Sequence, residues 1–130
     1  MNTVIESPVI TIKQDVKTLV SHYSSPGSFK ELMPKEVIKF EANAESFLFG
    51  LKGMPEVRLK VEEISEHQVM LKSSSDKLPF YLRVKFQPEE DITKAQIHFE
   101  GEFNPMLKMM IQRPLQNFVN HLSENMERIH

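Results

Sequence analysis

The sequence has 130 residues and a mass of 15.1 kDa, which suits one domain over residues 1–130 that buries roughly two thirds of its unfolded surface. With 40% hydrophobic residues, a formal charge of -2 and no cysteine, the composition argues against a disordered chain, a nucleic-acid partner, disulfides and cysteine zinc sites. No stretch approaches the ~20 apolar residues of a membrane span, and the start lacks the features of a signal peptide. We therefore expect a cytoplasmic protein without membrane insertion.

The first quarter of the chain predicts one strand and two short helices. Residues 4–12 are rich in β-branched side chains, and Pro8 places this strand at an edge or a bend. Apolar residues then follow at helical spacing over residues 16–23. A second short helix is predicted to begin after Ser25, with Pro26 in its first turn, and to end before Pro34.

The hydrophobic period changes to two at about residue 37, which predicts strands with one buried face. Alternating segments cover residues 37–42, 47–51, 57–62, 69–71, 80–87 and 95–103. The segments between them are short and turn-like, including Gly53-Met54-Pro55 and residues 73–79. Short connections favour antiparallel hairpins, so we predict a meander of about six strands.

A long helix is predicted over residues 106–129, with Asn104 as its cap and Pro105 in its first turn. One face of this helix carries an apolar stripe. Pro114 falls on the same face and is expected to kink the helix without ending it. The predicted stripe consists of Leu107, Ile111, Leu115, Phe118, Leu122 and Ile129.

Two stretches of the sequence, Ser7 to Pro34 (SPVITIKQDVKTLVSHYSSPGSFKELMP) and Gly101 to Met126 (GEFNPMLKMMIQRPLQNFVNHLSENM), resemble the SRPBCC superfamily. This superfamily includes START, Bet v 1-like and polyketide cyclase/dehydrase-like domains. The resemblance implies an α+β helix-grip fold, in which a curved antiparallel sheet of about seven strands wraps around the long terminal helix. It also implies a cavity between sheet and helix that often holds a hydrophobic molecule. Both motifs are structural, so the resemblance carries over no catalytic residue.

The chain shows no pattern typical of a metal site, a nucleotide cofactor or a catalytic centre. The five histidines (His22, His67, His98, His121 and His130) are scattered and lack metal-site spacing, and the four glycines form no phosphate-binding loop. Paired carboxylates fall in turns or on the polar side of strands, as a solvated surface requires. The predicted inward face offers no acid, base or nucleophile. We therefore predict no metal, no cofactor and no catalytic residues.

The candidate ligand-binding residues lie on three predicted surfaces. The inward face of the sheet contributes Phe49, Leu59, Leu82 and Phe99. A collar of flexible methionines at the start of the long helix and in the facing turn suits a cavity mouth or a self-association surface, with Met54, Met106 and Met110 as its candidates. The long helix adds Phe118, His121 and Asn125, of which the last two could orient a ligand or instead bond to nearby backbone.

These observations predict non-covalent binding of a small hydrophobic molecule, lipid-like or polyketide-like, between sheet and helix. A fully packed core without a cavity fits the same pattern. Two other functions stay open: an enzyme resembling polyketide cyclases or dehydratases, and a protein-interaction module without a ligand. The partners predicted are a small hydrophobic molecule and, through the methionines, a second copy of the chain in a homo-oligomer.

Overall fold

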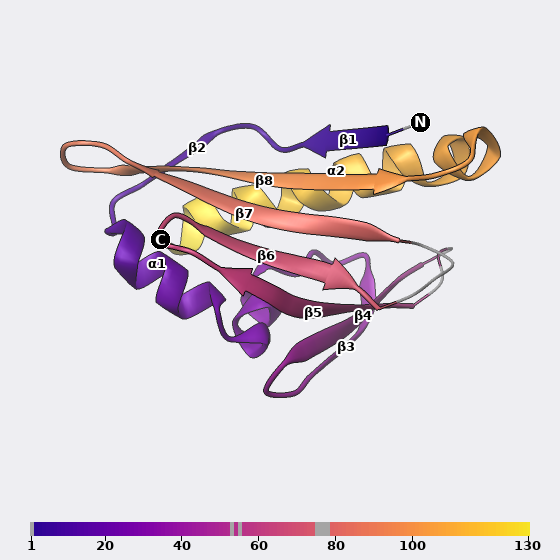
Figure 1. Cartoon of the computed structure of the whole chain (residues 1–130), viewed down its shortest axis with the longest axis horizontal. Helices are drawn as coiled ribbons and strands as arrows, with labels where there is room; N and C mark the ends of the chain where they lie inside the picture. Colours follow the sequence, from indigo (N-terminus) through magenta and orange to yellow (C-terminus); the bar gives the residue numbers. More distant parts are fainter. Residues whose placement is uncertain (1, 53, 55, 75–78) are drawn as a thin grey trace.

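The chain folds around one curved antiparallel sheet (Figure 1). The structure is a computed structural model that describes residues 2–52, 54, 56–74 and 79–130. The strand order is β1-β8-β7-β6-β5-β4-β3, with β2 also paired to β8. The six strands β3 to β8 form the predicted meander. The strands are β1 (Asn2–Glu6), β2 (Ile10–Ile12), β3 (Val37–Ala42), β4 (Ser46–Leu51), β5 (Val57–Ile64), β6 (Gln68–Ser73), β7 (Phe80–Pro88) and β8 (Thr93–Glu102).

The predicted first strand is divided in two at Pro8, which explains why the described sheet has eight strands. Proline has no N–H to donate to a sheet, and both halves still pair with β8 on either side of the break. Ser7 holds the junction: its backbone N–H donates to the Ile97 carbonyl at 2.9 Å, and its hydroxyl accepts from the Ile97 N–H at 2.9 Å. The side chain thus replaces a backbone acceptor that the break removes.

The strand that follows the turn at residues 89–92 shows the predicted alternation most clearly. In β8 every second residue is buried, from Thr93 through Gly101, while the residues between them are half-buried on the outer face. Outer neighbours include an ion pair in which the Arg83 guanidinium lies 3.0 Å from the Glu100 carboxylate. At the other edge, β3 is mostly exposed, because no further strand covers it among the described residues.

Three helices cover the inner face of the sheet in the described chain: α1 (Val16–Tyr23), the 3-10 helix η1 (Pro26–Leu32) and α2 (Pro105–Ile129). Figure 1 shows α2 running behind the sheet along β8, with its far end beside α1. Side-chain caps begin both α-helices, since Asp15 accepts from the Thr18 N–H at 3.3 Å and Asn104 from the Leu107 N–H at 2.8 Å. The second short helix predicted after Ser25 is present as the 3-10 helix η1.

The buried face of α2 differs from the predicted stripe at its two ends and at Pro114. The helix continues through Pro114, which is exposed instead of lying on the buried face. Ile129 is also exposed and Leu107 only half-buried, whereas Val119 and Met126 are fully buried. The buried face is wider than a sheet alone requires because η1 also packs against α2.

Candidate functional site

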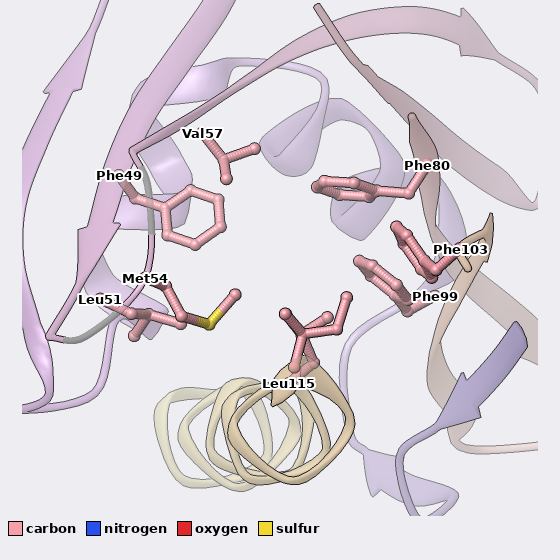
Figure 2. A pocket seen from close by; sticks show the side chains of 9 residues that line it. Phe49, Leu51, Met54, Val57, Phe80, Phe99, Phe103 and Leu115 are labelled. Atoms are coloured by element: carbon pink, nitrogen blue, oxygen red, sulfur yellow. The ribbon is translucent and has the colours of Figure 1, made fainter. Parts of the chain in front are cut away.

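An apolar cavity lies between the sheet and the first half of α2 (Figure 2). In Figure 2 side chains from β4, β5 and the segment after β4 face the aromatic rings of β7, β8 and Phe103 across it, and Leu115 of α2 closes one side. Among the described residues, the lining consists only of aliphatic, aromatic and methionine side chains. These residues are Phe49, Leu51, Met54, Val57, Phe80, Phe99, Phe103, Ile111 and Leu115.

The lining side chains nearly fill the cavity in this conformation, since only about 10 Å³ is open to the centre of a water molecule. That is about the space of a single water, which needs polar partners that these side chains do not offer. The aromatic walls are well packed: the Phe80 and Phe99 rings lie 4.4 Å apart, and Phe49 stacks on Phe118 with centroids at 4.8 Å. A ligand could enter only if side chains of the lining moved apart.

Two of the four candidate residues on the sheet line this cavity. Phe49 of β4 and Phe99 of β8 form opposite walls. Leu59 of β5 and Leu82 of β7 are fully buried, but they pack in the core outside the lining. Alternation along a strand predicts which side chains point inward, and it does not say which of those face a void.

The methionine candidates separate into one lining residue and an exposed group. Met54 lines the cavity, while the flanking Gly53 and Pro55 of the predicted turn lie outside the described residues. Met106 and Met110 are 75% and 68% exposed at the start of α2, with Met109 at 83% between them. None of these three lines the cavity in this conformation.

None of the three candidates on α2 belongs to the lining of the cavity. Phe118 and His121 line a separate groove of about 400 Å³ between α2 and the end of β4, and Leu51 is shared by this groove and the cavity. The Nδ1 atom of His121 is 3.7 Å from the Glu36 carboxylate. Asn125 donates through Nδ2 to the Leu32 carbonyl at 2.8 Å, so its amide bonds to backbone and ties α2 to η1.

Six lining residues were not among the sequence candidates: Leu51, Val57, Phe80, Phe103, Ile111 and Leu115. All six belong to segments that the hydrophobic pattern already placed in strands or on the helix stripe. Their common feature is position, since the end of β4, the first residues of β5 and β7 and the end of β8 meet the first half of α2 there. Only the pairing of strands and the placement of the helix bring them together.

A polar cluster lies at the opposite end of α2, and sequence reasoning missed it. The Glu31 carboxylate of η1 is 2.6 Å from His22 Nε2 of α1, and it accepts a hydrogen bond from the Tyr23 hydroxyl at 3.1 Å. His130, which follows α2, places its Nε2 2.6 Å from the same hydroxyl and 3.6 Å from the carboxylate. Four polar side chains from three helical segments thus share one small volume.

Burial and charge shift the pKa of three of these groups in different directions. Burial raises the pKa of the Tyr23 hydroxyl far above its ordinary value, and the neighbouring Glu31 charge adds to the effect. Burial lowers the pKa of His130, with Glu31 opposing it in part. For Glu31 burial acts upward, but hydrogen bonds and charge from His22, Tyr23 and His130 together hold its pKa below the usual value.

The cluster overturns the premise that the histidines are scattered. His22 and His130 are far apart in sequence, yet their rings lie 5.5 Å apart, and one ligand atom each from His22, Glu31 and His130 falls within 4.8 Å of the others. Spacing rules detect ligands that share one helix or loop. They cannot detect a pair joined by the return of the last helix to the first, so the sequence gives no signal for this site.

Comparison with solved structures gives the fold an independent check. Norcoclaurine synthase from Thalictrum flavum, solved in complex with dopamine and hydroxybenzaldehyde, aligns over 99% of this chain and 86% of its own at a TM-score of 0.75 and 14% identity. A START superfamily protein from Mycobacterium smegmatis aligns over 95% of this chain and 94% of its own, at a TM-score of 0.66 and 16% identity. Major latex-like protein 151 from Panax ginseng aligns over 99% of this chain and 97% of its own, at a TM-score of 0.66 and 9% identity. The chain has the START and Bet v 1-like helix-grip fold, as its sequence resemblance implied.

No protein-family model matches the chain, and no curated protein matches its sequence. Within the described residues, none of the helices has the length and apolar character needed to cross a bilayer.

Proposed function

We propose that the protein binds a small hydrophobic molecule non-covalently in the cavity between its sheet and the first half of α2. The observation that carries this proposal is the apolar lining, in which residues from β4, β5, β7, β8 and α2 converge on one void. Ligand sites are concave and mostly apolar, and they often lie between elements of different layers. Norcoclaurine synthase, which has this fold, holds two small aromatic molecules in its solved complex.

The small volume sets the manner of binding. Because the nearly filled cavity admits about one water, the ligand must displace side chains on entry, and the flexible thioether of Met54 offers the least resistance. The first half of α2 also has three exposed methionines and therefore few packing contacts to break. Binding in this chain is thus coupled to a local opening between α2 and the end of β4.

Catalysis in this cavity is the weaker alternative. Acid–base or nucleophilic catalysis needs a titratable or nucleophilic group within reach of the reacting atoms. The described lining has nine apolar residues: five on strands, Met54 and Phe103 in the segments after β4 and β8, and two on α2. None of them carries such a group. Cytoplasmic localisation, the absence of a nucleic-acid partner and self-association through the methionines remain predictions of the sequence.

The experiment is a titration with an environment-sensitive, uncharged apolar fluorophore, such as N-phenyl-1-naphthylamine, followed by competition with fatty acids and aromatic aldehydes. We expect saturable binding to the native chain. Ile111→Trp places a large ring in the cavity and is expected to weaken binding at least tenfold. Met109→Trp adds the same ring on the exposed side of the same helix and should leave binding unchanged.

Circular dichroism and melting curves establish that both variants are folded before binding is compared. Equal binding by the Ile111→Trp and Met109→Trp variants would place the fluorophore outside the cavity. Absence of saturable binding by any probe would favour a packed core, and with it the protein-interaction alternative.

A further inference from the structure

We infer that His22, Glu31 and His130 form a binding site for a divalent first-row transition metal, with Zn²⁺ as the best-suited ion. Two imidazoles and one carboxylate are a donor set that Zn²⁺ accepts. The three ligand atoms lie within 4.8 Å of one another and come from α1, η1 and the residue after α2. This site is separate from the apolar cavity and does not depend on the function proposed for it.

The distances require local rearrangement of the three side chains, because the ligand atoms of His22 and His130 lie up to 4.8 Å apart and must approach by as much as about 1.5 Å. Ligand atoms about 2.0 to 2.1 Å from a tetrahedral zinc lie about 3.3 Å from each other. The 3.6 Å between Glu31 Oε1 and His130 Nε2 is close to this value. The 2.6 Å between Glu31 Oε1 and His22 Nε2 must widen by about 0.7 Å, which rotation of two partly exposed side chains can supply.

The surroundings of the cluster favour an ordered site with one open side. The His130 side chain is only 8% exposed, and its ring packs edge-on against Tyr23 at 5.7 Å. The Tyr23 hydroxyl donates to Glu31, which orients the carboxylate as outer partners of metal ligands do. The Tyr23 hydroxyl lies 2.6 Å from His130 Nε2, so metal binding at this atom requires the hydroxyl and the imidazole to move apart, and the metal replaces their hydrogen bond. His22 and Glu31 side chains are 39% and 34% exposed, so the ion has a path from solvent and room for a water ligand.

Metal binding would link the two short helices near the N-terminus to the end of the long helix α2. The ligands belong to α1, η1 and the residue that follows α2, so an ion bound by all three restrains the end of α2 against the two short helices. An ion that binds only the folded arrangement stabilises it by mass action. The melting temperature should therefore rise with the concentration of free Zn²⁺.

The test is isothermal titration of Zn²⁺ into the untagged, metal-free full chain, together with native mass spectrometry and melting curves. We expect one Zn²⁺ per chain and a melting temperature that increases with free Zn²⁺. His22→Ala and Glu31→Gln change the two exposed ligands, so the fold should persist. Each is expected to weaken Zn²⁺ binding at least tenfold and to remove the thermal shift.

The matched control is His98→Ala. His98 also lies near carboxylates, with Nδ1 3.8 Å from Glu6 and Nε2 3.7 Å from Glu100, but on the outer face of the sheet. This variant should bind Zn²⁺ like the parent chain. Zn²⁺ binding that survives in both His22→Ala and Glu31→Gln, or that is lost equally in His98→Ala, would overturn the assignment, as would the absence of stoichiometric Zn²⁺ binding to the parent chain.

Discussion

The two halves of α2 differ in how they pack against the sheet, although they belong to one continuous helix. In the first half, Met106, Met109 and Met110 are exposed, and the buried residues Ile111 and Leu115 face a cavity. In the second half, Phe118, Val119, Leu122, Ser123 and Met126 are all buried. Asn125 and His130 add hydrogen bonds to Leu32 and Tyr23 on the short helices.

The difference shows where the fold is held and where it can open. Dense burial with satisfied polar groups gives high local stability, whereas segments with few apolar contacts open at lower cost. The second half of α2 therefore anchors the helix on the sheet. The first half covers the cavity with Ile111 and Leu115, and it is the part of the helix that we expect to move. The following variants test this division, in order of decreasing expected effect.

Replacement of Phe118, in the half of α2 that anchors the helix on the sheet, should have the largest effect on stability. This ring is buried and stacks on Phe49 at an interplanar angle of 6°. We expect Phe118→Ala to lower the free energy of unfolding by ~3 to 5 kcal/mol, because it removes a buried ring and leaves a void. Met109→Ala in the first half should change the unfolding free energy by less than about 0.5 kcal/mol. Urea unfolding measures both, and a loss below ~1 kcal/mol for Phe118→Ala would contradict the anchor.

Gly101 of β8 lies against two residues of the cavity wall, Phe80 and Phe103, and leaves no room for a side chain. A Cβ at this position would lie 2.7 Å from the Phe103 ring and 2.8 Å from the Pro79 carbonyl. We expect Gly101→Ala to lower the unfolding free energy by ~1 to 3 kcal/mol, since a backbone oxygen cannot easily give way. Gly27→Ala in η1 is the control, because its Cβ would meet nothing within 4 Å. Similar unfolding curves for the two variants would show that the wall is loosely packed.

The sequence predicted the layers of this fold better than the details that create its sites. Alternation over residues 95–103 and the spacing of Val16, Leu19, Val20 and Tyr23 identify buried faces, because these patterns depend only on local geometry. Pro8 indicated a bend for the same reason, since proline lacks the N–H that a strand donates. The burial of Met126 depends on which element packs alongside, and the pattern alone did not predict it.

The candidate sites were harder to predict because both depend on tertiary placement. The sequence named Phe49, Phe99 and Met54 among the lining residues, but it could not separate them from Leu59 and Leu82, which are equally apolar and inward. The contact between Tyr23 and His130 spans almost the whole chain and follows no periodicity. Polar groups gathered by the meeting of chain segments leave no local pattern in the sequence.

The tie between α2 and η1 should be measurable at Asn125. Its amide donates to the Leu32 carbonyl and its oxygen accepts from Arg128 at 3.1 Å. We expect Asn125→Ala to lower the unfolding free energy by ~1 kcal/mol, mainly because the Leu32 carbonyl loses its donor. Glu124→Ala, an exposed neighbour on the same turn, should have an effect below about 0.5 kcal/mol. Indistinguishable unfolding free energies would mean that water replaces the amide without cost.

The smallest effect on stability, and the sharpest test of the movable half, is expected at Met110. Its side chain is 68% exposed, so Met110→Glu should leave the unfolding free energy within about 0.5 kcal/mol of the parent chain. If the first half of α2 moves to admit a ligand, a charge at this position lies beside the opening and should weaken binding of an apolar fluorophore. Met110→Gln, which is polar and neutral, separates the effect of charge from the loss of the thioether. Unfolding of the Met110→Glu variant would show that Met110 belongs to the packed part of the helix. Unchanged fluorophore binding would place the opening elsewhere, with the groove beside Leu51 and Phe118 as the next position to block.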